Sequence, residues 1–362
     1  ILDDSDLATL DTTQTVGLEM NSSKSAASKT ETSIDLKNNA EIIADKKGSG
    51  SGAVGAYINY GLVNIDTTSK IKVEKDTTAG NTANAGAVGV YSVNGSEVDN
   101  KGSIEAGGKE SVGILAMAYG EVGGASLGKQ FGGKTGEGTF SVKNSGTIAM
   151  SDDDAIGIYA KNNNSSTASD DYKVTNAGTI EVKKSDSKTA IGIYADKAKV
   201  LPKDGTIKIG EKAVGIYAKD SIVGATGDNL GNIDFAGEKG VGIYLKDTST
   251  LLGNKVTLKQ TTTGTLKGKV GILADSLTNK TLTTEVVADT GVNDVIAYYS
   301  KGNGTLTVQA DISLNKNSTG ISGENTENLV YSGSKTMKLG EGSTGIFGQK
   351  NIDFASGSNI EL

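Results

Sequence analysis

The stretch Ala190-Ile191-Gly192-Ile193-Tyr194-Ala195 decides the fold of this chain, because copies of it recur along most of the sequence. Residues 155–160 and 213–218 repeat it almost unchanged, the run 295–298 keeps it without the glycine, and residues 16–18 resemble a worn first copy. Looser copies are centred on Gly55, Gly89, Gly113, Gly242, Gly271, Gly320 and Gly345. From Gly55 onward, successive centres lie 34, 24, 44, 35, 23, 27, 29, 25, 24 and 25 residues apart. The repeating unit is therefore about 24 residues, and the longer intervals carry insertions.

A second element lies between these copies and has the form Asn-x-Gly-Thr/Ser-Ile-x-Val/Ala. It occupies residues 100–106, 144–150 and 176–182, with shortened relatives at 205–209, 231–235 and 304–308. Apolar residues alternate with polar ones, so Ile180 and Val182 share one face of a strand, while Thr179 and Glu181 share the other. We expect the Asn and Gly ahead of each run to supply the left-handed backbone of a turn.

The predicted fold is all-β, a right-handed single-stranded parallel β-helix of about 12 coils of roughly 24 residues, with little or no α-helix. Each unit holds at least two short strands, which are too few to close a core, so successive units must stack and pair edge to edge. Leucine-rich, ankyrin and tetratricopeptide arrays need a helix or a leucine signature that is missing here. Unbroken repetition predicts one continuous domain over residues 1–362, with less regular early coils over 1–50.

Composition removes many kinds of chemistry. Cysteine, histidine and tryptophan are absent, and every basic residue is a lysine. Zinc, thiol, haem and imidazole sites are therefore excluded, and we expect no cofactor, no metal and no enzyme activity. A net charge of −7 and the lack of arginine argue against nucleic acid as a partner.

The two ends of the sequence suggest part of a longer rod. No run approaches the roughly 18 apolar residues of a membrane span, and residues 1–4 show no signal-peptide pattern. Residues 359–362 resemble residues 351–354 and so lie inside the repeat, whereas a solenoid usually ends in an atypical cap. We expect a monomeric rod.

The alternation of Asn-x-Gly-Thr-Ile with Ala-Val/Ile-Gly-Ile-Tyr-Ala over roughly residues 50–350 resembles the passenger repeats of the large fusobacterial type V autotransporter adhesins, the RadD-like family. The resemblance implies a bacterial cell-surface passenger, exported by a signal peptide and anchored in the outer membrane by a C-terminal β-barrel, neither of which is in this sequence. It further implies partners among bacterial or host-cell surface glycans and proteins, hence coaggregation, host adhesion and virulence. It carries over no binding motif residue by residue.

Two insertions are the predicted places of recognition, because ligands of a solenoid meet loops that protrude between strands. Residues 117–139 account for the 44-residue interval and hold Tyr119, Lys129 and Phe131 as candidate contacts. Residues 161–173 account for the 35-residue interval. They offer Asn163, Asp170 and Tyr172, whose amide, carboxylate and ring could hold a sugar. Either segment could equally be a polar surface loop without a partner.

Two further patterns allow a functional and a structural interpretation. If the Val and Ile of each copy face inward, then Gly and Tyr face outward and form an aromatic ladder that could bind sugar rings or pack within the scaffold. The structural role is favoured. The ladder consists of Tyr159, Tyr194, Tyr217 and Tyr244. Residues 152–154, three consecutive aspartates, could suggest calcium, but the glycine-rich calcium repeat is absent.

Three functions remain open at this point. The first is a non-enzymatic adhesive surface rod. The second is a polysaccharide lyase or hydrolase, since β-helices also carry such enzymes, although uniform repeats without arginine or histidine disfavour it. The third is a passive stalk that presents a distal head, which the regular coils from Gly192 to Gly345 resemble.

Overall fold

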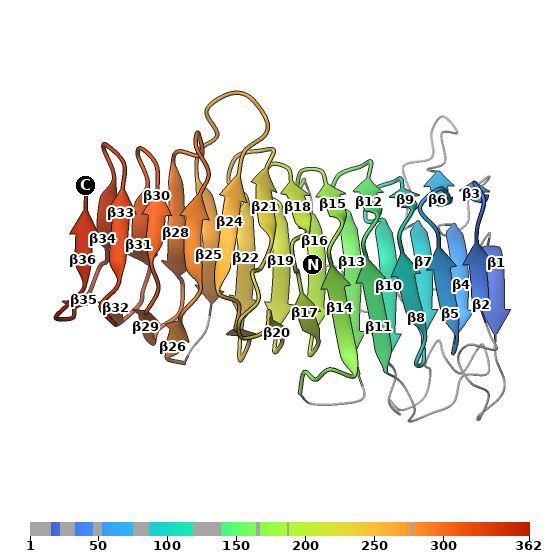
Figure 1. Ribbon diagram of the computed structural model, residues 1–362, viewed down its shortest axis with the longest axis horizontal. Coiled ribbons are helices and arrows are strands. Elements are labelled where there is room, and N and C mark those ends of the chain that lie inside the picture. The colour runs from blue at the N-terminus through green and yellow to red at the C-terminus, as the bar shows by residue number, and fades with distance from the viewer. Residues whose placement is uncertain are drawn as a thin grey trace.

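The computed structural model describes residues 16–21, 33–45, 53–74, 87–118, 139–163, 167–186, 188–275 and 278–362. These residues form strands and turns and contain no helix. The strands stack side by side along one axis, from β1 at one end of the rod to β36 at the other (Figure 1). All of the strand pairs are parallel, which confirms the predicted parallel β-helix. Its right-handed sense stays a prediction, supported by the strong preference of parallel crossovers for that hand.

Sheet A contains the Gly-Ile-Tyr copies, one strand from each coil. Its 12 strands agree with the predicted number of coils. At about 4.8 Å between strands they extend over about 50 Å. In order, they are β1 (Val16–Asn21), β4 (Val54–Asn59), β7 (Val88–Val93), β10 (Val112–Ala118), β13 (Ile156–Asn162), β16 (Ile191–Asp196), β19 (Val214–Lys219), β22 (Val241–Lys246), β25 (Lys269–Asp275), β28 (Val295–Ser300), β31 (Thr319–Gly323) and β34 (Thr344–Phe347).

Sheet C contains the Asn-x-Gly-Thr-Ile elements and has as many strands as sheet A. Its burial alternates as the sequence predicts, with Ile180 and Val182 inside and Thr179 and Glu181 outside. In order, the strands are β3 (Glu41–Asp45), β6 (Lys70–Glu74), β9 (Ser103–Ala106), β12 (Thr147–Met150), β15 (Thr179–Val182), β18 (Thr206–Ile209), β21 (Asn232–Phe235), β24 (Lys255–Lys259), β27 (Glu285–Ala288), β30 (Ile312–Leu314), β33 (Thr336–Leu339) and β36 (Asn359–Glu361).

A third face of the coil is formed by sheets B and D, so each coil has a third strand beyond the two that the sequence indicated. Sheet B consists of β2 (Ser33–Leu36), β5 (Leu62–Ile65), β8 (Glu97–Asn100), β11 (Phe140–Asn144), β14 (Tyr172–Asn176), β17 (Lys199–Leu201), β20 (Ile222–Val223) and β23 (Thr250–Leu251). Sheet D continues this face with β26 (Lys280–Leu282), β29 (Thr305–Val308), β32 (Asn328–Tyr331) and β35 (Asn351–Phe354).

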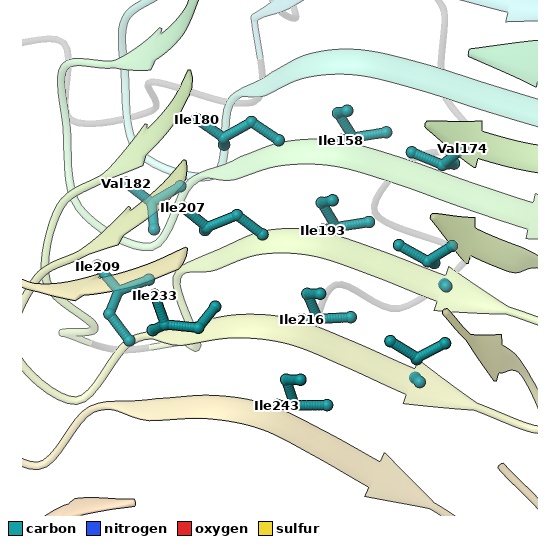
Figure 2. Close-up of a cluster of buried hydrophobic side chains, with 14 of the residues drawn as sticks. Ile158, Val174, Ile180, Val182, Ile193, Ile207, Ile209, Ile216, Ile233 and Ile243 are labelled. Carbon is teal, nitrogen blue, oxygen red and sulfur yellow. The ribbon is translucent and has the colours of Figure 1, made fainter. Parts of the chain in front are cut away.

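The interior is a set of aliphatic ladders that run along the rod. Ile158, Ile193 and Ile216 of sheet A stack at successive coils and face Ile180 and Ile207 of sheet C (Figure 2). All five side chains are buried. Because identical side chains lie one strand spacing apart, each coil continues the core of the previous one, which gives the stacked units their cohesion.

The Gly-Ile-Tyr strand is bent at its glycine, which corrects the predicted facing of its side chains. Ile216 points inward and Tyr217 outward, as expected, but Val214 shares the outer cluster with the tyrosine. A Cβ on Gly215 would lie 2.5 Å from the carbonyl oxygen of Gly242 on the next coil and 3.1 Å from Cδ1 of the interior Ile233. The motif requires glycine there because any side chain would strike the neighbouring coil.

The Asn-x-Gly element forms a buried amide ladder at the corner between sheets B and C. Asn100 donates to Oδ1 of Asn144, and Asn144 donates to Oδ1 of Asn176, each at 2.7 Å. Gly146 is not in a left-handed conformation, so the predicted reason for this glycine is wrong. Its absent Cβ would instead collide with the carbonyl oxygen of Gly102 on the preceding coil.

The coil without a Gly-Ile-Tyr glycine keeps the register of its neighbours. Val270 pairs with Ile296 and Ile272 with Tyr298, so the glycine position falls on Ala297 and not on Ile296. This shifts the sequence-based centre by one residue. At the other end, Val16 pairs with Val54 in β4, which confirms residues 16–18 as the first copy.

Candidate functional site

The first predicted recognition segment begins where β10 ends. Met117 is a buried residue of that strand and Ala118 is its last residue. The three candidate contacts Tyr119, Lys129 and Phe131 lie outside the described residues. They stay predictions.

The second segment is shorter than the predicted insertion, because β13 runs to Asn162 and β14 starts at Tyr172. The backbone N–H of Asn163 donates to the carbonyl of Ala118 at 2.8 Å and so extends the ladder of sheet A. Only the residues between these strands are available as a loop.

The candidate contacts of this loop already have partners within the chain. Tyr172 is half-buried and packs edge-on against Phe140 of the preceding coil, with ring centroids 5.7 Å apart. Both carboxylate oxygens of the exposed Asp170 accept from Nζ of Lys199 at 2.9 Å. This hydrogen bond holds the pKa of Asp170 below its ordinary value. A sugar would have to share Asp170 with Lys199.

The tyrosine ladder is part of the scaffold. Tyr159, Tyr194 and Tyr217 are 1%, 6% and 6% exposed, so they offer no open aromatic stripe. Their rings stack nearly parallel at successive coils, with planes 8° and 4° apart. The structural role that the sequence favoured is the one that the burial supports.

The last ring of the ladder is held by a polar contact. Tyr244 is half-buried and turned 61° from Tyr217. Its hydroxyl donates to Oδ2 of Asp275 at 2.5 Å, and Nζ of Lys246 lies 2.9 Å from the same oxygen. Burial, followed by this hydrogen bond, raises the pKa of Tyr244 well above its ordinary value. The carboxylate thereby closes the aromatic stack with a charged cluster.

The three consecutive aspartates are used by the chain itself. Asp152 accepts from the backbone N–H of Gly108 at 2.7 Å, and Asp154 accepts from the N–H of Asp186 at 2.5 Å. Asp153 lies 3.6 Å from Nζ of Lys184. Across the described ranges, no three acidic, histidine or cysteine side chains gather in a way that could hold a metal ion.

A hollow of about 570 Å³ lies on sheet C and was missed by the sequence analysis. It extends over strands β6, β9, β12 and β15, at their carboxyl ends. Small residues line its middle, where neighbouring coils carry long charged side chains: Gly107, Ala149 and Ser151. The signal was in the sequence, but it became visible only once register placed Ala149 between Glu105 and Glu181.

Charged residues bound the hollow on both sides. At one side Nζ of Lys72 lies 2.5 Å from Glu74, and at the other Nζ of Lys183 lies 3.2 Å from Glu181. Glu105 stands between them and forms no ion pair with any residue that the structure describes. Glu74 first, through its hydrogen bond, and Glu105 more weakly raise the pKa of Lys72. The nearest cation is therefore already engaged by another carboxylate.

Comparison with protein-family models, with curated proteins and with solved structures finds no match for this chain. The described residues contain no helix long and apolar enough to cross a membrane.

Proposed function

We propose that the chain is a non-enzymatic adhesive rod of a bacterial cell surface, which mediates adhesion to other bacteria or to host cells through glycans or proteins. The observation that carries the proposal is the stack of 12 parallel coils in one register. Such a scaffold holds side chains and loops at fixed spacing over about 50 Å, as an extended binding surface requires.

The resemblance of the repeats to fusobacterial type V autotransporter passengers supports the same proposal and supplies its setting. Under it, the rod is an extracellular passenger anchored in the outer membrane by other parts of its protein. The lack of cysteine fits export across two membranes, because disulfides formed between them would lock the chain before it crosses the second.

The two insertions remain the proposed contact regions, and the structure sharpens how they should be tested. Residues 119–138 and 164–170 can be replaced separately by Gly-Ser linkers without cutting β10, β13 or β14. A matched control replaces the exposed turn residues 263–265 in the same way. Purified rods are then assayed for binding to bacterial and to host cells.

The outcomes separate the three candidate functions. Loss of cell binding on either replacement, with the 263–265 control unaffected, supports loop-mediated adhesion. Binding that survives both replacements removes the loops as contacts, and no binding by the intact rod favours a passive stalk. Turnover of uronic-acid polymers, assayed with and without calcium, would establish the lyase or hydrolase alternative and overturn the proposal.

A further inference from the structure

A ladder of alternating charge runs along the outer face of sheet C, and one of its positions is missing a charge. The strands pair in continuous register, so one outward side chain per coil lines up along the rod. In order, these residues are Lys72, Glu105, Ala149, Glu181, Lys208, Asp234 and Lys259. Signs alternate at every step except at Ala149, where alternation calls for a cation.

The intact part of the ladder shows what a cation does at such a position. Nζ of Lys208 lies 3.7 Å from Oε1 of Glu181, one coil away. Opposite charges on adjacent strands are a favourable cross-strand pair. At Ala149 the corresponding cation is absent, and the two flanking carboxylates of Glu105 and Glu181 stand about 9.6 Å apart at their backbones, two strand spacings.

The missing side chain leaves the hollow described above. Its volume of about 570 Å³ lies in the range of small-ligand sites. Ala106, Met150 and Val73 contribute apolar lining, while Glu105 supplies a carboxylate without an ion-pair partner among the described residues. Cavity, apolar lining and charge therefore all match the space that one lysine side chain would fill.

We propose that this groove binds a primary ammonium group on an aliphatic stem, placed between Glu105 and Glu181 above Ala149. The ammonium completes the charge alternation, and the stem contacts the apolar lining. A free alkylamine or a lysine side chain of a partner protein would supply the same chemistry. A divalent cation fits less well, because the described residues bring no three acidic groups together here. The inference rests on the proposed function and names one contact of the same rod.

The test is an NMR titration of the labelled protein with n-butylamine at constant ionic strength. We expect the Ala149 methyl and the amides of Gly107 and Ser151 to shift. n-Butanol, which has the same stem without the charge, should bind at least tenfold more weakly. Equal responses to amine and alcohol, or the same shifts with calcium chloride and none with the amine, would overturn the proposal.

Two variants locate the site, and far-UV circular dichroism checks their fold. Glu105→Gln should weaken butylamine binding at least fivefold, whereas Glu327→Gln, which removes an exposed glutamate far along the rod, should leave it unchanged. Ala149→Lys should abolish binding and raise the melting temperature, because its own ammonium occupies the position. If Glu105→Gln does not fold, Ala149→Lys alone decides. Wild-type binding by this variant rejects the site.

Two further measurements identify the source of the ammonium and separate this inference from adhesion. Nα-acetyl-lysine methylamide binding more tightly than butylamine assigns a protein side chain, and weaker binding assigns a free amine; both support the chemistry. Cell binding that persists in a rod lacking any butylamine response would reject the groove and leave adhesion standing. A rod that binds butylamine and no cells would do the reverse.

Discussion

The ring of Tyr159 lies parallel to the ring of Tyr194 on the next coil, with centroids 4.7 Å apart and planes tilted by 8°. That separation equals the spacing between strands of one sheet, so the backbone pairing itself sets the stacking distance. Ile156 and Ile191 pack in the same outer cluster. The tyrosine of the repeat thus ties neighbouring coils together on the outer face, as isoleucine does on the inner one.

Replacement of one stacked ring should therefore weaken the rod. Tyr194→Ala removes a side chain that is 6% exposed and packs between two other rings. We expect a loss of about 3 to 5 kcal/mol in the free energy of unfolding, as for other large buried aromatics. Urea denaturation followed by circular dichroism measures it. Tyr244→Ala is the matched control and should lose less, since Tyr244 is only half-buried. Equal losses would contradict the role given to burial.

The bend at the glycine of the repeat predicts a sharp difference between two glycines. A Cβ at position 215 would lie 2.5 Å from the carbonyl oxygen of Gly242, whereas at position 271 it would lie 2.9 Å from the oxygen of Ala297. We expect Gly215→Ala to cost about 3 kcal/mol through overpacking, and Gly271→Ala clearly less. The order of the two urea midpoints checks this, and a reversed order would show that the clash does not explain the motif.

The buried amide ladder predicts a large effect at its central member. Asn144→Ala leaves the donor of Asn100 and the acceptor of Asn176 without their partner. With a cost of about 1 to 3 kcal/mol for each unsatisfied buried group, the variant should lose about 2 to 4 kcal/mol. Asn351→Ala, which removes one exposed hydrogen bond to Asn328, serves as the control. If the two variants unfold at the same urea concentration, the ladder contributes only what a surface amide does.

Periodicity in the sequence was sufficient to predict the parallel coils, because a strand pattern that recurs every 24 residues can bury its Ile side chains only by stacking. The third strand of each coil was missed for a physical reason. β20 and β23 are two residues long, too short to show alternation. Val214 was assigned to the wrong face because the bend at Gly215 breaks the period of two that the interpretation assumed.

The candidate groove could not be found by searching for reactive residues, since its defining feature is an alanine. Ala149 is unremarkable within its own strand and becomes informative only beside Glu105 and Glu181. These partners lie 44 and 32 residues away, and insertions make the two intervals unequal. Sequence spacing alone does not give that register; the hydrogen-bonded ladder does.

A buried carboxylate at the end of β16 predicts a pH-dependent gain in stability on its removal. Asp196 is 5% exposed, its Oδ1 accepts no hydrogen bond from the described residues, and its Oδ2 is 4.0 Å from Nζ of Lys219. Burial raises its pKa above the ordinary 3.8, against the opposing charge of Lys219. The folded state therefore holds this proton more tightly than the unfolded state does, and the ionised carboxylate costs stability at neutral pH.

Asp196→Asn should accordingly raise the melting temperature at pH 7 by about 1 to 2 °C. The gain should shrink as the pH falls through the folded-state pKa and vanish below 3.8, where the carboxyl group is protonated in both states. Asp170→Asn is the opposite case: the Lys199 hydrogen bond lowers the pKa of Asp170, so its stabilising effect exists above 3.8 and is lost in acid. Melting curves of both variants from pH 3 to 7 should thus diverge with opposite slopes. Parallel slopes would mean that burial does not control the charge of Asp196.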